Sequence, residues 1–156
     1  MGKGALMARI FIADDDPDIR HLLTYALADE GHQVAAAGDG PSALEALRTE
    51  SCDVLILDIM MPDMDGYELL TALEEMDLRQ NMKVMILTAK GSERDWEQGF
   101  EAGADLYITK PFDPQEVTGG VEQLLTSSDE ELSLMRERER DRAHLLSQLE
   151  DILGDV

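Results

Sequence analysis

The sequence has little cysteine, few aromatic residues and few basic ones. Its one cysteine, Cys52, excludes an internal disulfide bond and fits a reducing compartment, so we expect a cytoplasmic protein. Against 34 Asp and Glu there are only 13 Lys and Arg, and the net charge is −21. A surface of this sign repels the phosphates of nucleic acids and anionic lipids. No apolar run approaches the roughly 20 residues of a membrane span. We therefore expect neither direct binding to nucleic acid nor a place in a membrane.

The length and the apolar fraction indicate one globular domain with an appendage. The chain has 156 residues, of which 44% are hydrophobic, which is enough for a core that folds unaided. We expect residues 1–7 to be an N-terminal tail or a remnant of the expression vector. Residues 8–126 are then the domain, and residues 127–156 a C-terminal helix that acts as a linker or a coiled-coil dimerisation segment.

Five short apolar runs alternate with stretches of helical period. The runs are Ile10–Ala13, Val34–Ala37, Val54–Leu57, Val84–Leu87 and Leu106–Ile108. Because they are apolar throughout, they predict strands of a parallel sheet buried on both faces. Asp16-Pro17 and Asp113-Pro114 have the capping acid and the proline typical of helix starts. The alternation predicts an α/β fold, a five-stranded doubly wound parallel sheet with helices on both faces, and the chain is too short for an eight-unit barrel.

Charged or hydroxyl residues follow four of the five predicted strands. They are Asp14 and Asp15, Asp58, Thr88, and Lys110. Taken singly, each is more often a turn residue, a helix cap or a solvated strand end than a functional group. In open parallel sheets, however, ligands bind beyond the carboxyl ends of the strands, where these side chains would converge. Several acids, a hydroxyl and a lysine at one edge indicate a shared ligand.

Carboxylates at this edge favour a small hard cation, and Mg²⁺ prefers oxygen ligands and phosphate oxygens. The predicted metal ligands are Asp14, Asp15, Asp58 and the backbone carbonyl of Met60. Lys110 would neutralise a phosphoryl oxygen, and Thr88 would donate a hydrogen bond to one. A carboxylate can itself attack phosphorus to form an aspartyl phosphate, and Asp58 is the best placed to do so.

The sequence resembles the receiver domain of bacterial two-component response regulators over residues 8–125. The resemblance rests on the segments FIADDDPDIR, DVLILDIMMPDMDGYELL, VMILTA and AGADLYITKPFDPQEV and on their order and spacing. It implies the flavodoxin-like strand order 2-1-3-4-5. It also implies a phosphorylation switch rather than a turnover enzyme. Asp58 would receive its phosphoryl group from a phosphohistidine of a sensor histidine kinase or a histidine phosphotransfer protein, and the switch would control a downstream protein or an output domain.

The resemblance assigns a role to each residue of the predicted site. Asp15 and Asp58 would bind Mg²⁺ directly, and Asp14 mainly through water. Lys110 would bind the phosphoryl group, and Pro111 would follow a cis peptide bond. Thr88 and Tyr107 would act as the switch residues. Ala89 would be the small residue beside the site, and the side chains of Met60 and Lys90 would tune the lifetime of the phosphoryl group. Trp96 and Phe100, four residues apart, are expected to pack in the core.

Two other functions fit parts of the sequence. One is a Mg²⁺-dependent phosphatase of the haloacid-dehalogenase-like type, which also forms an aspartyl phosphate; Asp63-Met64-Asp65 has the spacing of its Asp-x-Asp motif but follows Pro62 in a predicted loop. The other is a receiver that forms the front end of a larger signalling enzyme, such as a diguanylate cyclase or a histidine kinase.

The C-terminal segment begins with a capping box, in which Ser128 is followed three residues later by Glu131. Leu132, Met135, Leu146, Leu149 and Leu153 fit a heptad frame, although Glu139 and Arg142 interrupt it. Three arrangements are open: a linker helix, a parallel coiled coil that forms a homodimer, and a helix folded back on its own domain. The sequence favours the first two.

Overall fold

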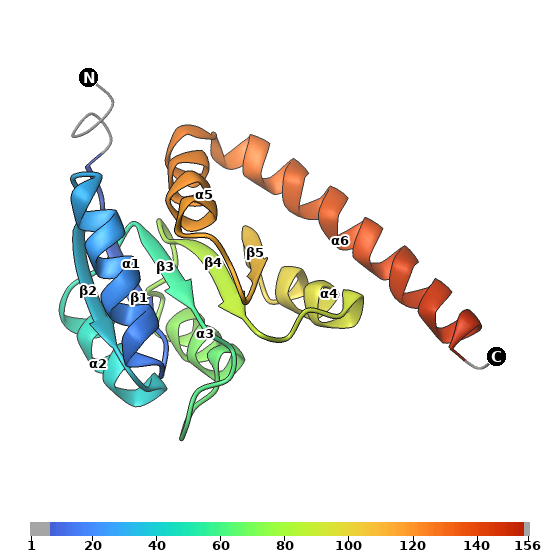
Figure 1. Cartoon of the computed structure of the whole chain (residues 1–156), viewed down its shortest axis with the longest axis horizontal. Helices are drawn as coiled ribbons and strands as arrows, with labels where there is room; N and C mark the ends of the chain where they lie inside the picture. The colour runs from blue at the N-terminus through green and yellow to red at the C-terminus, as the bar shows by residue number, and fades with distance from the viewer. Residues whose placement is uncertain (1–6, 155–156) are drawn as a thin grey trace.

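A computed structural model describes residues 7–154 and has a five-stranded parallel sheet at its centre (Figure 1). The strands are β1 (Arg9–Ala13), β2 (Gln33–Ala37), β3 (Val54–Leu57), β4 (Lys83–Thr88) and β5 (Leu106–Thr109). Their order in the sheet is β2-β1-β3-β4-β5, which confirms the predicted fold class and strand order. Apart from Met7, the predicted N-terminal tail lies outside the described residues.

Six helices accompany these strands in the described part of the chain. They are α1 (Pro17–Asp29), α2 (Gly40–Thr49), α3 (Gly66–Glu75), α4 (Glu93–Glu101), α5 (Pro114–Thr126) and α6 (Asp129–Leu153). Two capping residues predicted from the sequence are confirmed. At the start of α1 the Asp16 side chain accepts a hydrogen bond from the Asp18 N–H, and at the start of α6 the Ser128 side chain accepts one from the Glu131 N–H. None of the helices in residues 7–154 has the length and apolar character needed to cross a bilayer.

The sheet separates two hydrophobic cores. On one face, α2, α3 and α4 cover a cluster that includes Leu55, Leu57 and Ile86. On the other face, α1 and α5 cover a cluster that includes Ile12 and Ile56, and Leu132 of α6 joins this second cluster. Residues of the three central strands alternate between the two cores, which explains why these strands carry no polar side chains along most of their length.

The prediction that all five strands are buried on both faces is wrong for β2. Its residues are exposed or only half-buried, because β2 lies at the edge of the sheet with a single neighbour, β1. Small side chains at Ala35 and Ala36 gave this strand the same apolar pattern as the central ones. Apolar composition therefore identified the strand but not its position in the sheet.

The C-terminal helix folds back on its own domain, the arrangement that the sequence did not favour. Ser127 and Ser128 turn the chain at the end of α5, and α6 then runs past α4, packs against it and extends beyond the rest of the domain (Figure 1). Leu132, the first residue of the heptad frame, is 2% exposed within the domain's own core. The apolar pattern is the same for an intramolecular partner and for a second copy of the chain, so the sequence could not separate them.

Candidate functional site

Backbone pairing brings the residues after β1, β3 and β5 to one edge of the sheet. The Asp58 N–H donates to the carbonyl of Ala13, and that of Lys110 donates to the carbonyl of Thr88, at 2.8 and 2.9 Å. Asp14 and Asp58 thus lie side by side, and Lys110 stands beside the end of β4. The convergence expected from the parallel topology is present.

Lys110 joins the two buried acids of this edge. Its Nζ lies 2.8 Å from Oδ2 of Asp14 and 2.7 Å from Oδ2 of Asp58. Burial alone would lower the pKa of Lys110, but its contacts with the Asp14 and Asp58 carboxylates outweigh burial and raise that pKa, so the ammonium stays charged. Burial raises the pKa of Asp14, and the ion pair with Lys110 opposes this effect only in part. Lys110 is therefore firmly protonated, whereas ionisation of the buried Asp14 carboxyl costs free energy.

The Asp58 carboxylate is fixed by two donors. It is 4% exposed, and its Oδ1 accepts a hydrogen bond of 2.9 Å from the Met60 N–H while its Oδ2 faces Lys110. Asp14 is similarly held, because its Oδ1 accepts from the Asp16 N–H at 2.9 Å, whereas Asp15 is exposed. Two rigid acids and one accessible acid make an ordered site with an open side.

The three carboxylates fit a divalent cation. Asp14, Asp15 and Asp58 each offer an oxygen, and these oxygens lie within 4.8 Å of one another. Carboxylate oxygens are the ligands that Mg²⁺ prefers, and an accessible side leaves it room to keep several waters. The Met60 N–H points to Asp58, and the role predicted for the Met60 carbonyl stays a prediction.

Thr88 and Tyr107 lie behind this edge. Thr88 is fully buried, and its Oγ1 has no hydrogen-bond partner among the described residues. The ring of Tyr107 points inward, is 7% exposed, and lies with its centroid 5.6 Å from that of Trp96; its hydroxyl donates to the carbonyl of Lys90 at 2.5 Å. The peptide bond between Lys110 and Pro111 is cis, as the resemblance implied. The side chains of Ala89 and Lys90 are exposed.

Sequence reasoning missed Arg20, which contacts the backbone of the site. Its Nη1 donates to the carbonyl of Asp14 at 2.8 Å from α1. The guanidinium lies against Gly38, where an added Cβ would approach Nη1 to 2.9 Å, so a side chain at this position would displace the guanidinium. The sequence offers one signal for this contact, a glycine directly after the predicted strand Val34–Ala37.

The family described as the response regulator receiver domain matches residues 10–122. The alkaline phosphatase synthesis transcriptional regulatory protein PhoP of Bacillus subtilis is 40% identical over 121 residues, which are 78% of this chain and 50% of that protein. The DNA-binding response regulator MtrA of Mycolicibacterium smegmatis is 37% identical over 79% of this chain and 53% of its own length. The chain belongs to the response regulator receiver family.

Solved receiver structures agree with this assignment. The chemotaxis protein CheY4 of Vibrio cholerae has a TM-score of 0.72 and 30% identity, and the match covers 76% of this chain and 99% of that one. The response regulator TrrA of Thermotoga maritima, solved in complex with Mg²⁺ and BeF, has a TM-score of 0.67 and 34% identity over 76% of this chain and 100% of that one. Receiver domains bind Mg²⁺ at an acidic cluster, and Asp14, Asp15 and Asp58 of this chain form a group of carboxylates that could hold such an ion.

The receiver assignment bears on two earlier expectations. The phosphatase alternative is not favoured: Asp63 lies in the loop after β3 with a positive φ of 69°, and Asp65 caps α3 by accepting from the Glu68 N–H at 2.9 Å. The expectation of no contact with nucleic acid conflicts with the names of relatives such as MtrA, which is called DNA-binding. This chain spans about half the length of the curated relatives it matches, and those names describe the whole proteins.

Proposed function

We propose that this receiver domain accepts a phosphoryl group on Asp58 in a Mg²⁺-dependent reaction and changes conformation in response. The observation that carries the proposal is the Asp58 carboxylate, buried at the end of a central strand and held by Lys110 and the Met60 N–H beside two further acids. A buried acid in such company is suited to nucleophilic attack on phosphorus rather than to a turn.

The chemistry transfers a phosphoryl group from nitrogen to oxygen. An Asp58 oxygen attacks the phosphorus of a partner's phosphohistidine, the P–N bond breaks as the P–O bond forms, and the imidazole leaves with the bonding electrons. Lys110 would exchange its contacts with the two carboxylates for a phosphoryl oxygen and offset the charge that builds there. Mg²⁺, held by Asp15 and Asp58 directly, by Asp14 through water and by the Met60 carbonyl, would neutralise the remaining charge on the transferred group.

The response is a shift between two conformations. Thr88, whose hydroxyl lacks a partner within the described residues, would donate to a phosphoryl oxygen, and this contact would stabilise the inward orientation of Tyr107. A hundredfold shift requires about 2.7 kcal/mol of difference between the contacts in the two states. Two charge-assisted hydrogen bonds, from Lys110 and Thr88, are of that size. Ala89 leaves space beside the phosphoryl group, and the side chains of Met60 and Lys90 tune its lifetime.

The partners follow from the same chemistry. The donor is a sensor histidine kinase or a histidine phosphotransfer protein in the cytoplasm, and the recipient of the signal is a downstream protein or an output domain. The receiver itself catalyses its phosphorylation and its dephosphorylation but turns over no external substrate. Its domain limits are residues 8–126, with residues 127–156 as the C-terminal helical segment.

Intact-mass measurement tests the acceptor. The wild type and Asp58→Asn are incubated in parallel with acetyl phosphate and Mg²⁺, and we expect one added phosphoryl group in the wild type alone. The matched control is Asp53→Asn, an exposed acid at the opposite end of β3, which should be phosphorylated like the wild type. An adduct on Asp58→Asn would place the acceptor elsewhere, and steady turnover of an added phosphomonoester would favour the phosphatase instead.

A further inference from the structure

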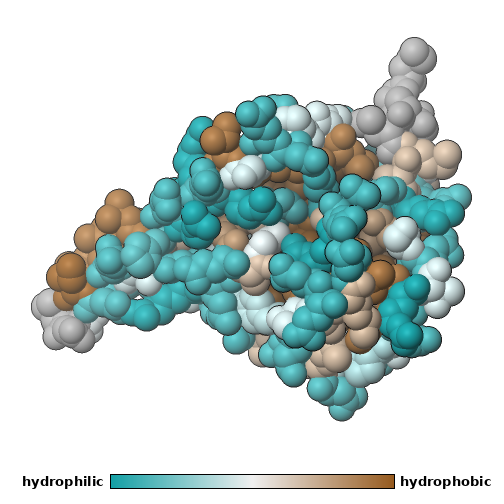
Figure 2. Space-filling view, turned by 180° about the vertical axis from the view of Figure 1, so that it is seen from behind, coloured by the Kyte–Doolittle hydropathy of each residue, from teal (hydrophilic) through white to brown (hydrophobic). Residues whose placement is uncertain are grey.

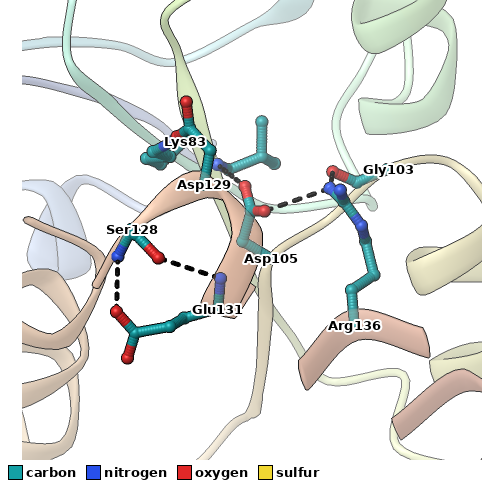
Figure 3. Close-up of polar contacts among 8 residues, drawn as sticks. Lys83, Gly103, Asp105, Ser128, Asp129, Glu131 and Arg136 are labelled. Atoms are coloured by element: carbon teal, nitrogen blue, oxygen red, sulfur yellow. Dashed lines mark hydrogen bonds and ion pairs between the residues drawn. The ribbon is translucent and has the colours of Figure 1, made fainter. Parts of the chain in front are cut away.

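The start of α6 is held to the sheet by polar contacts that lie at the opposite end of β4 from Thr88. A reciprocal capping box fixes its first turn, with the Ser128 N–H donating to Glu131 at 3.1 Å and the Glu131 N–H to Ser128 at 3.0 Å (Figure 3). Asp129 forms an ion pair with Lys83, the first residue of β4. The capping box thus orders the first turn of α6, and the Lys83–Asp129 ion pair joins that turn to the sheet.

Two turns after Asp129, Arg136 of α6 forms an ion pair with a buried acid. Asp105, at the entry to β5, is 7% exposed, and its Oδ2 accepts a hydrogen bond of 2.9 Å from the Val84 N–H. Burial raises the pKa of Asp105, and the Val84 hydrogen bond and the charge of Arg136 oppose this effect. Figure 3 shows Arg136 reaching both Asp105, at 3.1 Å, and the carbonyl of Gly103. Undocking α6 would remove this cation from a carboxylate that has little access to water.

The second half of α6 packs against α4. Ala143 and Ser147, one helical turn apart, are 0% and 6% exposed, so the two helices approach closely along small side chains. Polar pairs flank this contact: His144 lies 2.6 Å from Glu97, and Arg94 forms an ion pair with Asp151. The contact thus has buried small residues at its centre and polar pairs at its margin, as specific protein interfaces do.

The other side of α4 packs against the inward Tyr107. Its ring lies 5.6 Å from that of Trp96 and 6.4 Å from that of Phe100, centroid to centroid. It also lies so close to Gly99 that a Cβ there would approach the ring to 2.7 Å. The position of α4 and the inward orientation of Tyr107 therefore depend on each other, and α4 stands between Tyr107 and α6.

We propose that docking of α6 on α4 is coupled to phosphoryl binding at Asp58, such that the docked helix favours the phosphorylated conformation. The docked helix, the present position of α4 and the inward Tyr107 occur together in one structure, and the inward Tyr107 is the orientation that phosphoryl binding is proposed to stabilise. The proposal rests on the proposed function, because Thr88 and Tyr107 connect Asp58 to α4. Coupling of this kind is reciprocal, so ligand binding at Asp58 must also strengthen the docking of α6.

Calorimetric titration of the full chain with beryllofluoride in the presence of Mg²⁺ tests the coupling. Ala143→Glu places a charge in the buried contact with α4 and should weaken beryllofluoride binding by about tenfold. Leu134→Glu adds the same charge elsewhere on α6, where the side chain is 54% exposed, and should bind like the wild type. Equal or tighter binding by Ala143→Glu would overturn the proposal.

Hydrogen exchange of the wild type supplies a test that needs no substitution. Saturating Mg²⁺ and beryllofluoride should slow exchange of the α6 amides around Ala143, and unchanged exchange there would overturn the coupling even if Ala143→Glu fails to fold. Failure of the proposed function looks different, since the wild type would then bind no beryllofluoride or Asp58→Asn would bind it equally well.

Discussion

At the scale of the residue, Lys110 decides the charge balance of the site. It is the only cation within 3 Å of the Asp14 and Asp58 carboxylates among the described side chains, and it reaches both. Two buried acids side by side would otherwise repel each other and exchange one charge for a proton. The arrangement costs stability at Asp14, because burial raises the pKa of this carboxyl in spite of Lys110.

Asp14→Asn should therefore stabilise the fold. A carboxyl with a raised pKa in the folded state costs stability once it is ionised, so the cost is present at neutral pH and disappears as the pH falls through the raised pKa toward the ordinary value of 3.8. We expect a gain on the order of 1 kcal/mol at pH 7, smaller near pH 4, in urea denaturation. Asp15→Asn, at an exposed position, is the control and should change stability less. A less stable Asp14→Asn at pH 7 would contradict this account.

The site residues were predictable because their positions depend on topology alone. Strand ends of a parallel sheet converge, so Asp14, Asp58, Thr88 and Lys110 were expected at one edge before any distance was known. The contact of Arg20 was not predictable in this way, since it depends on the position of α1 against the sheet and on the space left by Gly38. The orientation of Tyr107 likewise depends on packing against α4, which strand order does not fix.

At the scale of the element, two adjacent glycines in α5 have different reasons to be there. An added Cβ at Gly119 would meet nothing within 4 Å, whereas one at Gly120 would lie 2.7 Å from Cε of Met85 and 3.3 Å from Cδ1 of Leu106. Gly120 thus lets α5 approach the sheet closely, and Gly119 only adds flexibility to the unfolded and the folded chain.

This pair provides its own control. Gly119→Ala should raise the free energy of unfolding by about 1 kcal/mol, the usual difference between the two residues within a helix. Gly120→Ala should gain less or lose stability, because Met85 and Leu106 must move to make room. Thermal and urea denaturation of the two variants measure the difference, and equal gains would show that the α5 contact with the sheet is looser than the structure indicates.

The start of α6 was predicted from its capping box, but its partner was not. A helix boundary is set by neighbouring residues, whereas the surface that receives the helix is formed by Lys83, Asp105 and α4, far away in the sequence. In the sequence nothing distinguishes Arg136 from the other arginines of the same segment. Only the structure distinguishes it, by its contact with Asp105, a buried acid that no local sequence pattern predicts.

At the scale of the whole molecule, the far end of α6 extends past the domain and carries apolar side chains. Leu145, Leu149, Ile152 and Leu153 are between 45% and 68% exposed, and they form the apolar patch near the C-terminal end in Figure 2. The predicted homodimer through the C-terminal helix would use this patch, since Leu132 and Ala143 are already buried within one chain. It stays a prediction.

Light scattering over a range of concentrations tests the homodimer. We expect the wild type to show a mass that rises toward twice that of one chain, and Leu149→Lys to remain monomeric, because a charge in the middle of the patch opposes apolar contact between two copies. Arg138→Ala, exposed on the same helix but outside the patch, is the control. A wild type that is monomeric at every concentration would exclude the homodimer.

The burial of Cys52 makes the molecule convenient to label. The thiol is 8% exposed, and burial raises its pKa to about 12, so almost none of it is the reactive thiolate at neutral pH. It is also the only cysteine of the chain. A second cysteine placed on the outer face of α6 would therefore take a dye or a spin label at one site without removal of the native thiol. Trp96 is the single tryptophan of the chain and lies beside Tyr107. Its fluorescence can be transferred to a dye on α6, so one substitution supplies an energy donor and an acceptor across the α4–α6 contact. The docking of the helix can then be followed by fluorescence in an otherwise native protein.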